Sequence, residues 1–164
     1  MKLQMWINKL VPEEYAKQLE LIAELPEELR FCVGQPIFVR TAEQELQIWP
    51  RLEANDVLKI FQAACRQSVY AHTNTIRQGY LALEGGHRMG ICGFGVCQDN
   101  ELQTLVSPSS LVLRVAKAYP GCAGSLGARC NGSTLILGPP GCGKTTLLRD
   151  FVRYLSRTRY QTFG

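Results

Sequence analysis

The residues with the clearest chemical potential lie near the end of the sequence, where Gly138-Pro-Pro-Gly-Cys-Gly-Lys144-Thr145 has the spacing G-x-x-x-x-G-K-[ST]. Glycines in such a loop let the backbone adopt positive φ, so that several N–H groups converge on phosphate oxygens. The Lys144 ammonium can reach β and γ phosphates, and the Thr145 hydroxyl can bind magnesium. The pattern therefore predicts a phosphate-binding loop for ATP, or a related nucleoside triphosphate, together with Mg²⁺.

The expected nucleotide site is one continuous segment of the chain. It comprises Gly138, Pro139, Pro140, Gly141, Cys142, Gly143, Lys144, Thr145 and Thr146. The Cys142 thiol could act as a redox sensor, but this position of the pattern tolerates many residue types. His87 could act as a general base, although beside a Gly-Gly turn a solvated or hydrogen-bonded histidine is commoner.

Two flanking elements must position this loop. Residues 133–137 form a short, continuous apolar run, which is typical of a strand buried in a parallel sheet. Residues 144–157 predict an amphipathic helix. Its packed face holds Leu147, Leu148, Phe151, Val152 and Leu155. A helix that begins where the loop ends directs its free amides and the positive end of its dipole at the phosphates.

The first 130 residues predict an α+β domain with antiparallel strands. Helices are expected over residues 11–25, 55–66 and 70–77, with a short helical turn after Pro26, and strands over 36–40, 46–49, 80–84, 87–92 and 110–115. Turns are expected at 85–86, 93–95 and 99–100. The glycine-rich segment 119–132 predicts a linker, so we place the domain boundary after residue 130.

Composition narrows the function classes. The 164 residues are 46% hydrophobic with a net charge of +4, and residues 1–60 hold 7 basic and 10 acidic side chains, against 11 and 4 in the remainder. The basic residues are scattered without interleaved aromatics, so no nucleic-acid partner is expected. Seven cysteines without a CxxC pair, and two histidines, give little support for a zinc site. We expect a cytoplasmic protein with reduced thiols, which reaches membranes peripherally or through partners.

Several segments resemble one known family along nearly the whole chain. They are residues 26–30, 34–38, 79–93, 109–115, 121–123 and 137–150. Together they are similar to the stage III sporulation protein AA family, ATPases of endospore-forming bacteria related to secretion and pilus-motor ATPases. The Gly85-Gly-His-Arg88 stretch is far more specific than the phosphate-loop pattern alone.

The resemblance implies an α/β protein in two parts. Residues 1–130 would be the N-terminal α+β domain of a secretion-type ATPase, and residues 131–164 would supply the first strand, P-loop and helix of an incomplete RecA-like domain. It also implies a ring-shaped homo-oligomer and membrane-embedded channel components as partners. In such ATPases arginines of the N-terminal domain approach the nucleotide, and Arg88 and Arg114 occupy similar strands; pairing with neighbouring side chains would suit them equally.

One departure from a working motor affects the expected activity. Only 20 residues follow Lys144, and they include no acidic strand that could serve as a Walker B segment. We therefore expect this chain alone to hydrolyse ATP poorly. Three hypotheses remain: the ATP-binding part of a sporulation ATPase that serves the channel between mother cell and forespore, a motor of another secretion or pilus system, and a non-catalytic scaffold.

Overall fold

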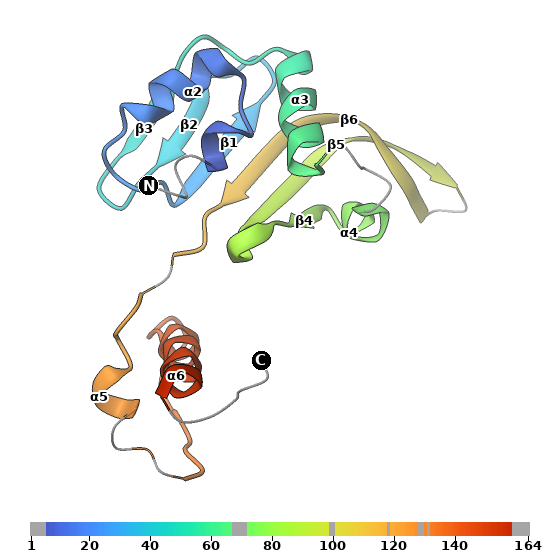
Figure 1. The fold of residues 1–164 in the computed structure, drawn as a ribbon. Coiled ribbons are helices and arrows are strands. Elements are labelled where there is room, and N and C mark those ends of the chain that lie inside the picture. The colour runs from blue at the N-terminus through green and yellow to red at the C-terminus, as the bar shows by residue number, and fades with distance from the viewer. Residues whose placement is uncertain are drawn as a thin grey trace. The chain divides into compact units, whose positions relative to one another are not determined.

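The structure is a computed structural model that describes residues 6–66, 72–98, 101–117, 119–127, 130 and 132–158 (Figure 1). The chain divides into two compact units, Met1–Ala116 and Lys117–Gly164. The domain boundary expected after residue 130 falls inside the second unit and stays a prediction.

The first unit is built on a six-stranded sheet. Its strands are β1 (Glu28–Cys32), β2 (Ile37–Arg40), β3 (Glu45–Ile48), β4 (Tyr80–Ala82), β5 (Arg88–Gln98) and β6 (Glu101–Arg114). They are ordered β3-β2-β1-β6-β5-β4, and every neighbouring pair is antiparallel. The α+β class with antiparallel strands is confirmed.

One face of this sheet forms the hydrophobic core of the unit. Side chains alternate between faces along a strand, so Leu29 and Phe31 of β1 point to the same side as Leu111 and Leu113 of β6, and all four are fully buried. Helices α2 (Glu13–Glu20), α3 (Ala54–Ala64) and α4 (Thr73–Arg77) belong to the same unit, and α3 packs against β6. Burial of each large apolar side chain contributes about 1.5–3 kcal/mol.

Helix α3 shows how local sequence places an element. Its buried residues are Val57, Ile60, Phe61 and Ala64, whose spacing places them on one face of the helix. A capping box at its start joins Glu53 and Asp56, whose carboxylate accepts the Glu53 N–H at 2.9 Å. The helix expected over 11–25 is shorter, as α2, and the start of the one expected over 70–77 lies outside the described residues.

The segment after Pro26 was expected to be helical, and this prediction is wrong. Residues 28–32 form β1, which lies between β2 and β6 in the middle of the sheet. Pro-Glu-Glu-Leu resembles a helix start, but Leu29 and Phe31 alternate with Glu28 and Arg30 in the two-residue period of a strand. Pairing on both sides outweighs the local preference.

The turns expected at 93–95 are also absent, because these glycines lie inside β5. Strands β5 and β6 form a long hairpin that extends beyond the rest of the sheet (Figure 1). Its register shifts three times, between Cys92 and Gly93, Phe94 and Gly95, and Val96 and Cys97. A Cβ on Gly93 would lie 2.2 Å from the Ser107 carbonyl oxygen, so glycine serves close strand contact here. The turn expected at 99–100 lies outside the described residues.

The second unit holds α5 (Gly124–Gly127) and α6 (Lys144–Thr158), which pack against each other. The strand expected over residues 133–137 is not formed: these residues have no regular secondary structure, and Leu135 and Leu137 are each 81% exposed. A strand needs a neighbour to satisfy its backbone groups, and the described part of this unit contains no other strand.

Candidate functional site

The glycine-rich loop leads directly into α6, as its sequence predicted. Gly141 and Gly143 have φ of 78° and 85°, in the left-handed region that favours glycine, and α6 begins at Lys144. A Cβ on Gly138 would lie 2.6 Å from the Cys142 sulfur, so the two ends of the loop approach closely. The backbone therefore has the tight curvature that convergent amides require.

The Lys144 side chain lies across this loop. Its ammonium donates to the carbonyl oxygens of Gly138 at 2.8 Å and Pro139 at 2.6 Å, and lies 3.7 Å from the Cys142 sulfur. Thr145 is exposed and Thr146 is half-buried. The predicted cation, hydroxyl and glycine-rich backbone therefore lie together at the start of one helix. The N–H groups of the loop and the Lys144 ammonium are suitable donors for triphosphate oxygens, and the Thr145 hydroxyl is a suitable ligand for Mg²⁺.

A cavity of about 530 Å³ adjoins the loop, within the size range of small-molecule sites. It is lined by Tyr119, Cys122, Ile136, Leu137, Cys142, Gly143, Lys144, Thr146 and Leu147. Most of these side chains are apolar, and Lys144 and Thr146 bring the polar groups of the loop to its edge.

A buried carboxylate anchors α6, and sequence analysis missed it. Asp150 Oδ2 accepts the Ala123 N–H at 2.9 Å, and Arg153 donates to Oδ1. The Ala123 hydrogen bond is the main cause that holds the pKa of Asp150 below its usual value. The signal available in the sequence was an acidic residue within a helix whose other charged side chains are basic.

The two predicted arginines lie in the first unit, opposite each other on β6 and β5. Arg114 and Arg88 are direct cross-strand partners. The Arg88 guanidinium carbon lies 5.8 Å from the centroid of the Tyr80 ring, a cation–π contact. Arg114 forms an ion pair with Glu28, Nε to Oε2 at 3.6 Å. Both arginines thus have neighbours in the sheet, as the alternative interpretation allowed.

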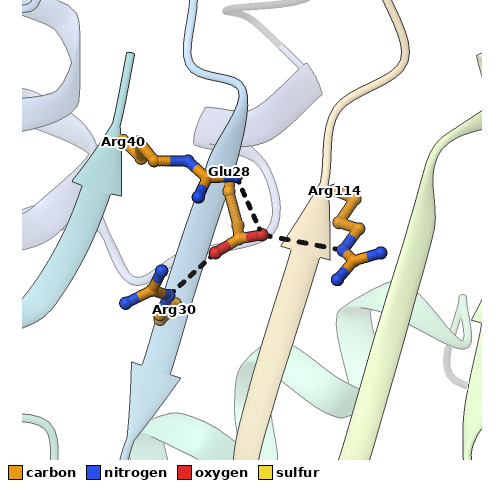
Figure 2. Close-up of polar contacts among 4 residues, drawn as sticks. All are labelled: Glu28, Arg30, Arg40 and Arg114. Carbon is orange, nitrogen blue, oxygen red and sulfur yellow. Dashed lines mark hydrogen bonds and ion pairs between the residues drawn. The ribbon is translucent and has the colours of Figure 1, made fainter. Parts of the chain in front are cut away.

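Glu28 also pairs with two further arginines, Arg30 and Arg40, which the sequence analysis did not single out. Arg30 Nε donates to Oε1 at 2.8 Å, and Arg40 Nη2 donates to Oε2 at 3.3 Å (Figure 2). The residue is only 6% exposed, although it lies on the face opposite the hydrophobic core. The sequence signal was the alternation of charged and apolar residues in β1, which the prediction of a helical turn after Pro26 left out.

His87 is a structural side chain in this geometry. It is buried, stacks on Trp6 with ring centroids 4.9 Å apart, and its Nδ1 accepts the Ala116 N–H at 2.9 Å. Burial lowers its pKa. All seven cysteines are free thiols. In the described ranges, no three His, Cys, Asp or Glu side chains gather to hold a metal ion, and no helix could span a bilayer.

The mixed α/β structure with its antiparallel sheet resembles the N-terminal part of secretion ATPases of known structure. The structure resembles the Legionella pneumophila ATPase DotB, with a TM-score of 0.51, 15% identity, and 95% of this chain aligned to 43% of that one. It also resembles the pilus retraction motor PilT, solved with bound ADP, with a TM-score of 0.51, 20% identity, and 85% aligned to 42%. At these identities the likeness establishes the fold alone.

The family follows from the sequence. The family described as "Sporulation stage III, protein AA" matches residues 3–163, and the chain belongs to this family. Over 160 residues it is 30% identical to the stage III sporulation protein AA of Bacillus subtilis, which covers 92% of this chain and 52% of that protein. The chain therefore spans about half the length of the curated relative that it matches.

Proposed function

We propose that this chain is the ATP-binding portion of a sporulation stage III ATPase, with residues 138–146 as a P-loop that binds magnesium ATP. The observation that carries the proposal is the backbone at Gly141 and Gly143, whose positive φ values bend the loop onto the start of α6 beside Lys144. The family relationship supports it, and so does the ADP named for PilT, a protein of similar fold.

The residues of the loop have distinct roles in this proposal. Backbone amides from Gly141 to Lys144 bind phosphate oxygens, aided by the positive end of the α6 dipole. The Lys144 ammonium exchanges the Gly138 and Pro139 carbonyls for β and γ phosphate oxygens, and the Thr145 hydroxyl holds the metal. Bound Mg²⁺ would neutralise negative charge on the phosphates.

In the complete protein, we propose that ATP hydrolysis supports assembly or operation of the channel between mother cell and forespore. The protein would act in the cytoplasm as a homo-oligomeric ring, in contact with membrane-embedded components. Arg88 and Arg114 of the N-terminal domain would contact the nucleotide. Resemblance to secretion ATPases supports these roles, and the segments of the relatives beyond this chain would supply the remaining catalytic groups.

The test is a thermal titration of the 164-residue chain with magnesium ATP. Binding to the folded state should raise the melting temperature, by an amount that grows with ligand concentration. Lys144→Ala should abolish or strongly reduce the shift. Arg149→Ala is the matched control, because it removes one positive charge from an exposed site on the same helix; its shift should equal that of the wild type.

A scaffold function is the alternative with an observation of its own. Residues 133–137, which would support the loop as a buried strand, are largely exposed and irregular. If magnesium ATP stabilises neither the wild type nor the control, the P-loop proposal fails for this chain and the scaffold alternative is favoured. A motor of another secretion or pilus system is the remaining alternative. Transmembrane channel components encoded beside the gene would distinguish it from the sporulation ATPase.

A further inference from the structure

The face of the sheet opposite the hydrophobic core carries a row of charged side chains. The register places Glu45, Arg40, Glu28, Arg114 and Arg88 side by side on five neighbouring strands. Arg30 lies two residues from Glu28 on the same face. We call Arg30, Arg40, Arg88 and Arg114 the arginine face. Counted with Glu28 at its centre and Glu45 at its end, four positive and two negative charges leave a net charge of +2.

This arrangement is unfavourable without compensation. Like charges directly opposite each other on paired strands repel, as Arg88 and Arg114 do. A carboxylate as buried as Glu28 is costly unless it is paired and hydrogen-bonded. Three of the four arginines satisfy that need, and they come from three different strands. Glu28 therefore restrains three long arginine side chains, which without it would be mobile and would repel one another.

The contacts of Glu28 leave the outer edge of Arg114 available. The ion pair uses its Nε, and the dashed line in Figure 2 joins the Glu28 carboxylate to this nitrogen and to neither Nη. The Arg114 side chain is 78% exposed, against 43% for Arg30 and 47% for Arg40. A guanidinium paired through Nε leaves its two Nη nitrogens for another acceptor, and two N–H groups in one plane form the fork that binds phosphate oxygens in pairs.

We propose that Glu28 is a positioning residue for phosphate recognition: its buried carboxylate holds Arg114, together with Arg30 and Arg40, so that the exposed guanidinium edge binds phosphate oxygens. The inference rests on the proposed role of Arg114 as a nucleotide contact and explains how that side chain is oriented. Glu28 itself touches no phosphate, since its oxygens are negative and already occupied.

Simple charge and positioning make opposite predictions for Glu28→Gln. The substitution removes a negative charge from the face, so charge alone would tighten the binding of an anion. Positioning predicts weaker binding, because arginines no longer held by the carboxylate must be ordered by the ligand. That ordering corresponds to a loss of affinity of about two- to tenfold.

The experiment titrates inorganic tripolyphosphate into the full chain carrying Lys144→Ala, and follows the arginine ¹⁵Nε–H signals by NMR. The Lys144 substitution weakens phosphate binding by the glycine-rich loop. The Arg114 signal reports phosphate binding at the arginine face separately from binding at the loop. We expect the Arg114 signal to shift with tripolyphosphate. Adding Glu28→Gln should weaken the affinity and broaden or shift the Arg30 and Arg114 signals before any ligand is present.

Two further variants keep the test decisive. Glu45→Gln is the matched control, since it removes a negative charge from the same row, and its affinity should be unchanged or tighter. Glu28→Asp keeps the charge but shortens the side chain by one methylene, so it should fold and still weaken binding. Melting temperatures show which variants are folded.

Each outcome decides the proposal. Equal or tighter tripolyphosphate binding by folded Glu28→Gln overturns it, and if that variant does not fold, unchanged affinity in Glu28→Asp does the same. An Arg114 signal that ignores tripolyphosphate also overturns it. None of these results bears on the loop, which the magnesium ATP titration tests by itself. Repeating the NMR titration with magnesium ATP in place of tripolyphosphate shows whether the face prefers a nucleotide to a free polyphosphate.

Discussion

Three buried polar side chains illustrate how single residues organise this chain. Glu28 joins three strands through arginines, Asp150 ties α6 to Ala123, and His87 accepts a hydrogen bond from Ala116. Buried polar groups are stable only when their partners are supplied by the fold. Apart from Arg30, which is two residues from Glu28, those partners lie between 12 and 86 residues away along the chain, so local patterns did not reveal them.

The pH dependence of stability should report on His87. Burial lowers its folded-state pKa below the usual value of 6.5, whereas the unfolded chain retains the usual value. Below about pH 6.5 the unfolded state therefore binds a proton that the folded state does not, and the free energy of unfolding falls until the folded pKa is reached. Urea denaturation between pH 7.5 and 5.5 measures this fall.

His87→Asn supplies the comparison for that measurement. Asparagine can present an oxygen near the place of Nδ1 and does not titrate in this range. We expect the variant to lose less stability than the wild type over the same interval, whatever their difference at pH 7.5. Parallel pH profiles for the two proteins would contradict the assignment of His87 as a buried neutral acceptor.

At the scale of elements, the sequence predicted helices and strands correctly where apolar residues repeat at helical or strand spacing. It failed where the outward residues of a strand are charged. Helix α3 and strands β2 and β3 were anticipated because their apolar positions repeat at helical or strand spacing. Strand β1 was missed because its outward residues, Glu28 and Arg30, are charged, and the acidic residues after Pro26 look locally like a helix start. The glycines of the β5–β6 hairpin resemble turn residues in the sequence, because close contact between strands leaves no local sequence pattern.

Gly93 offers a test of that close contact. In Gly93→Ala the new Cβ would lie 2.2 Å from the Ser107 carbonyl oxygen and 2.7 Å from Pro108 Cα, so backbone must move. We expect the free energy of unfolding in urea to fall by about 1–3 kcal/mol. Gly90→Ala, on the same strand, would place its Cβ an ordinary 3.9 Å from Val112 and should cost little. Equal effects of the two substitutions would refute the steric explanation.

For the whole molecule, the sequence predicted the glycine-rich loop and the start of α6 better than the segment that precedes them. Spacing alone located Gly141, Gly143 and the start of α6, since a glycine-rich loop before a helix is a local feature. The sequence could not show that residues 133–137 lack a neighbouring strand in this unit, because burial depends on what surrounds a segment. An apolar segment can be buried, but it is buried only where other parts of the fold pack against it.

Leu137 tests the point, because it was expected in a buried strand and is 81% exposed. In this chain Leu137→Ser should change the stability of α6 by less than about 0.5 kcal/mol, measured by native-state amide hydrogen exchange. Leu113→Ala, at a fully buried position, should cost about 2–5 kcal/mol in the first unit. A large loss of protection in α6 for Leu137→Ser would mean that the side chain is buried after all.

The place of β1 between β2 and β6 also constrains how the chain is made. Glu28 pairs with Arg114, so the middle of the sheet joins residues that a ribosome produces far apart in time. Until β6 is synthesised, β1 has an unsatisfied edge, and a strand with one apolar face in that condition can pair with the wrong strand. The first unit should therefore acquire its native sheet, and with it the arginine face, only after β6 has been synthesised.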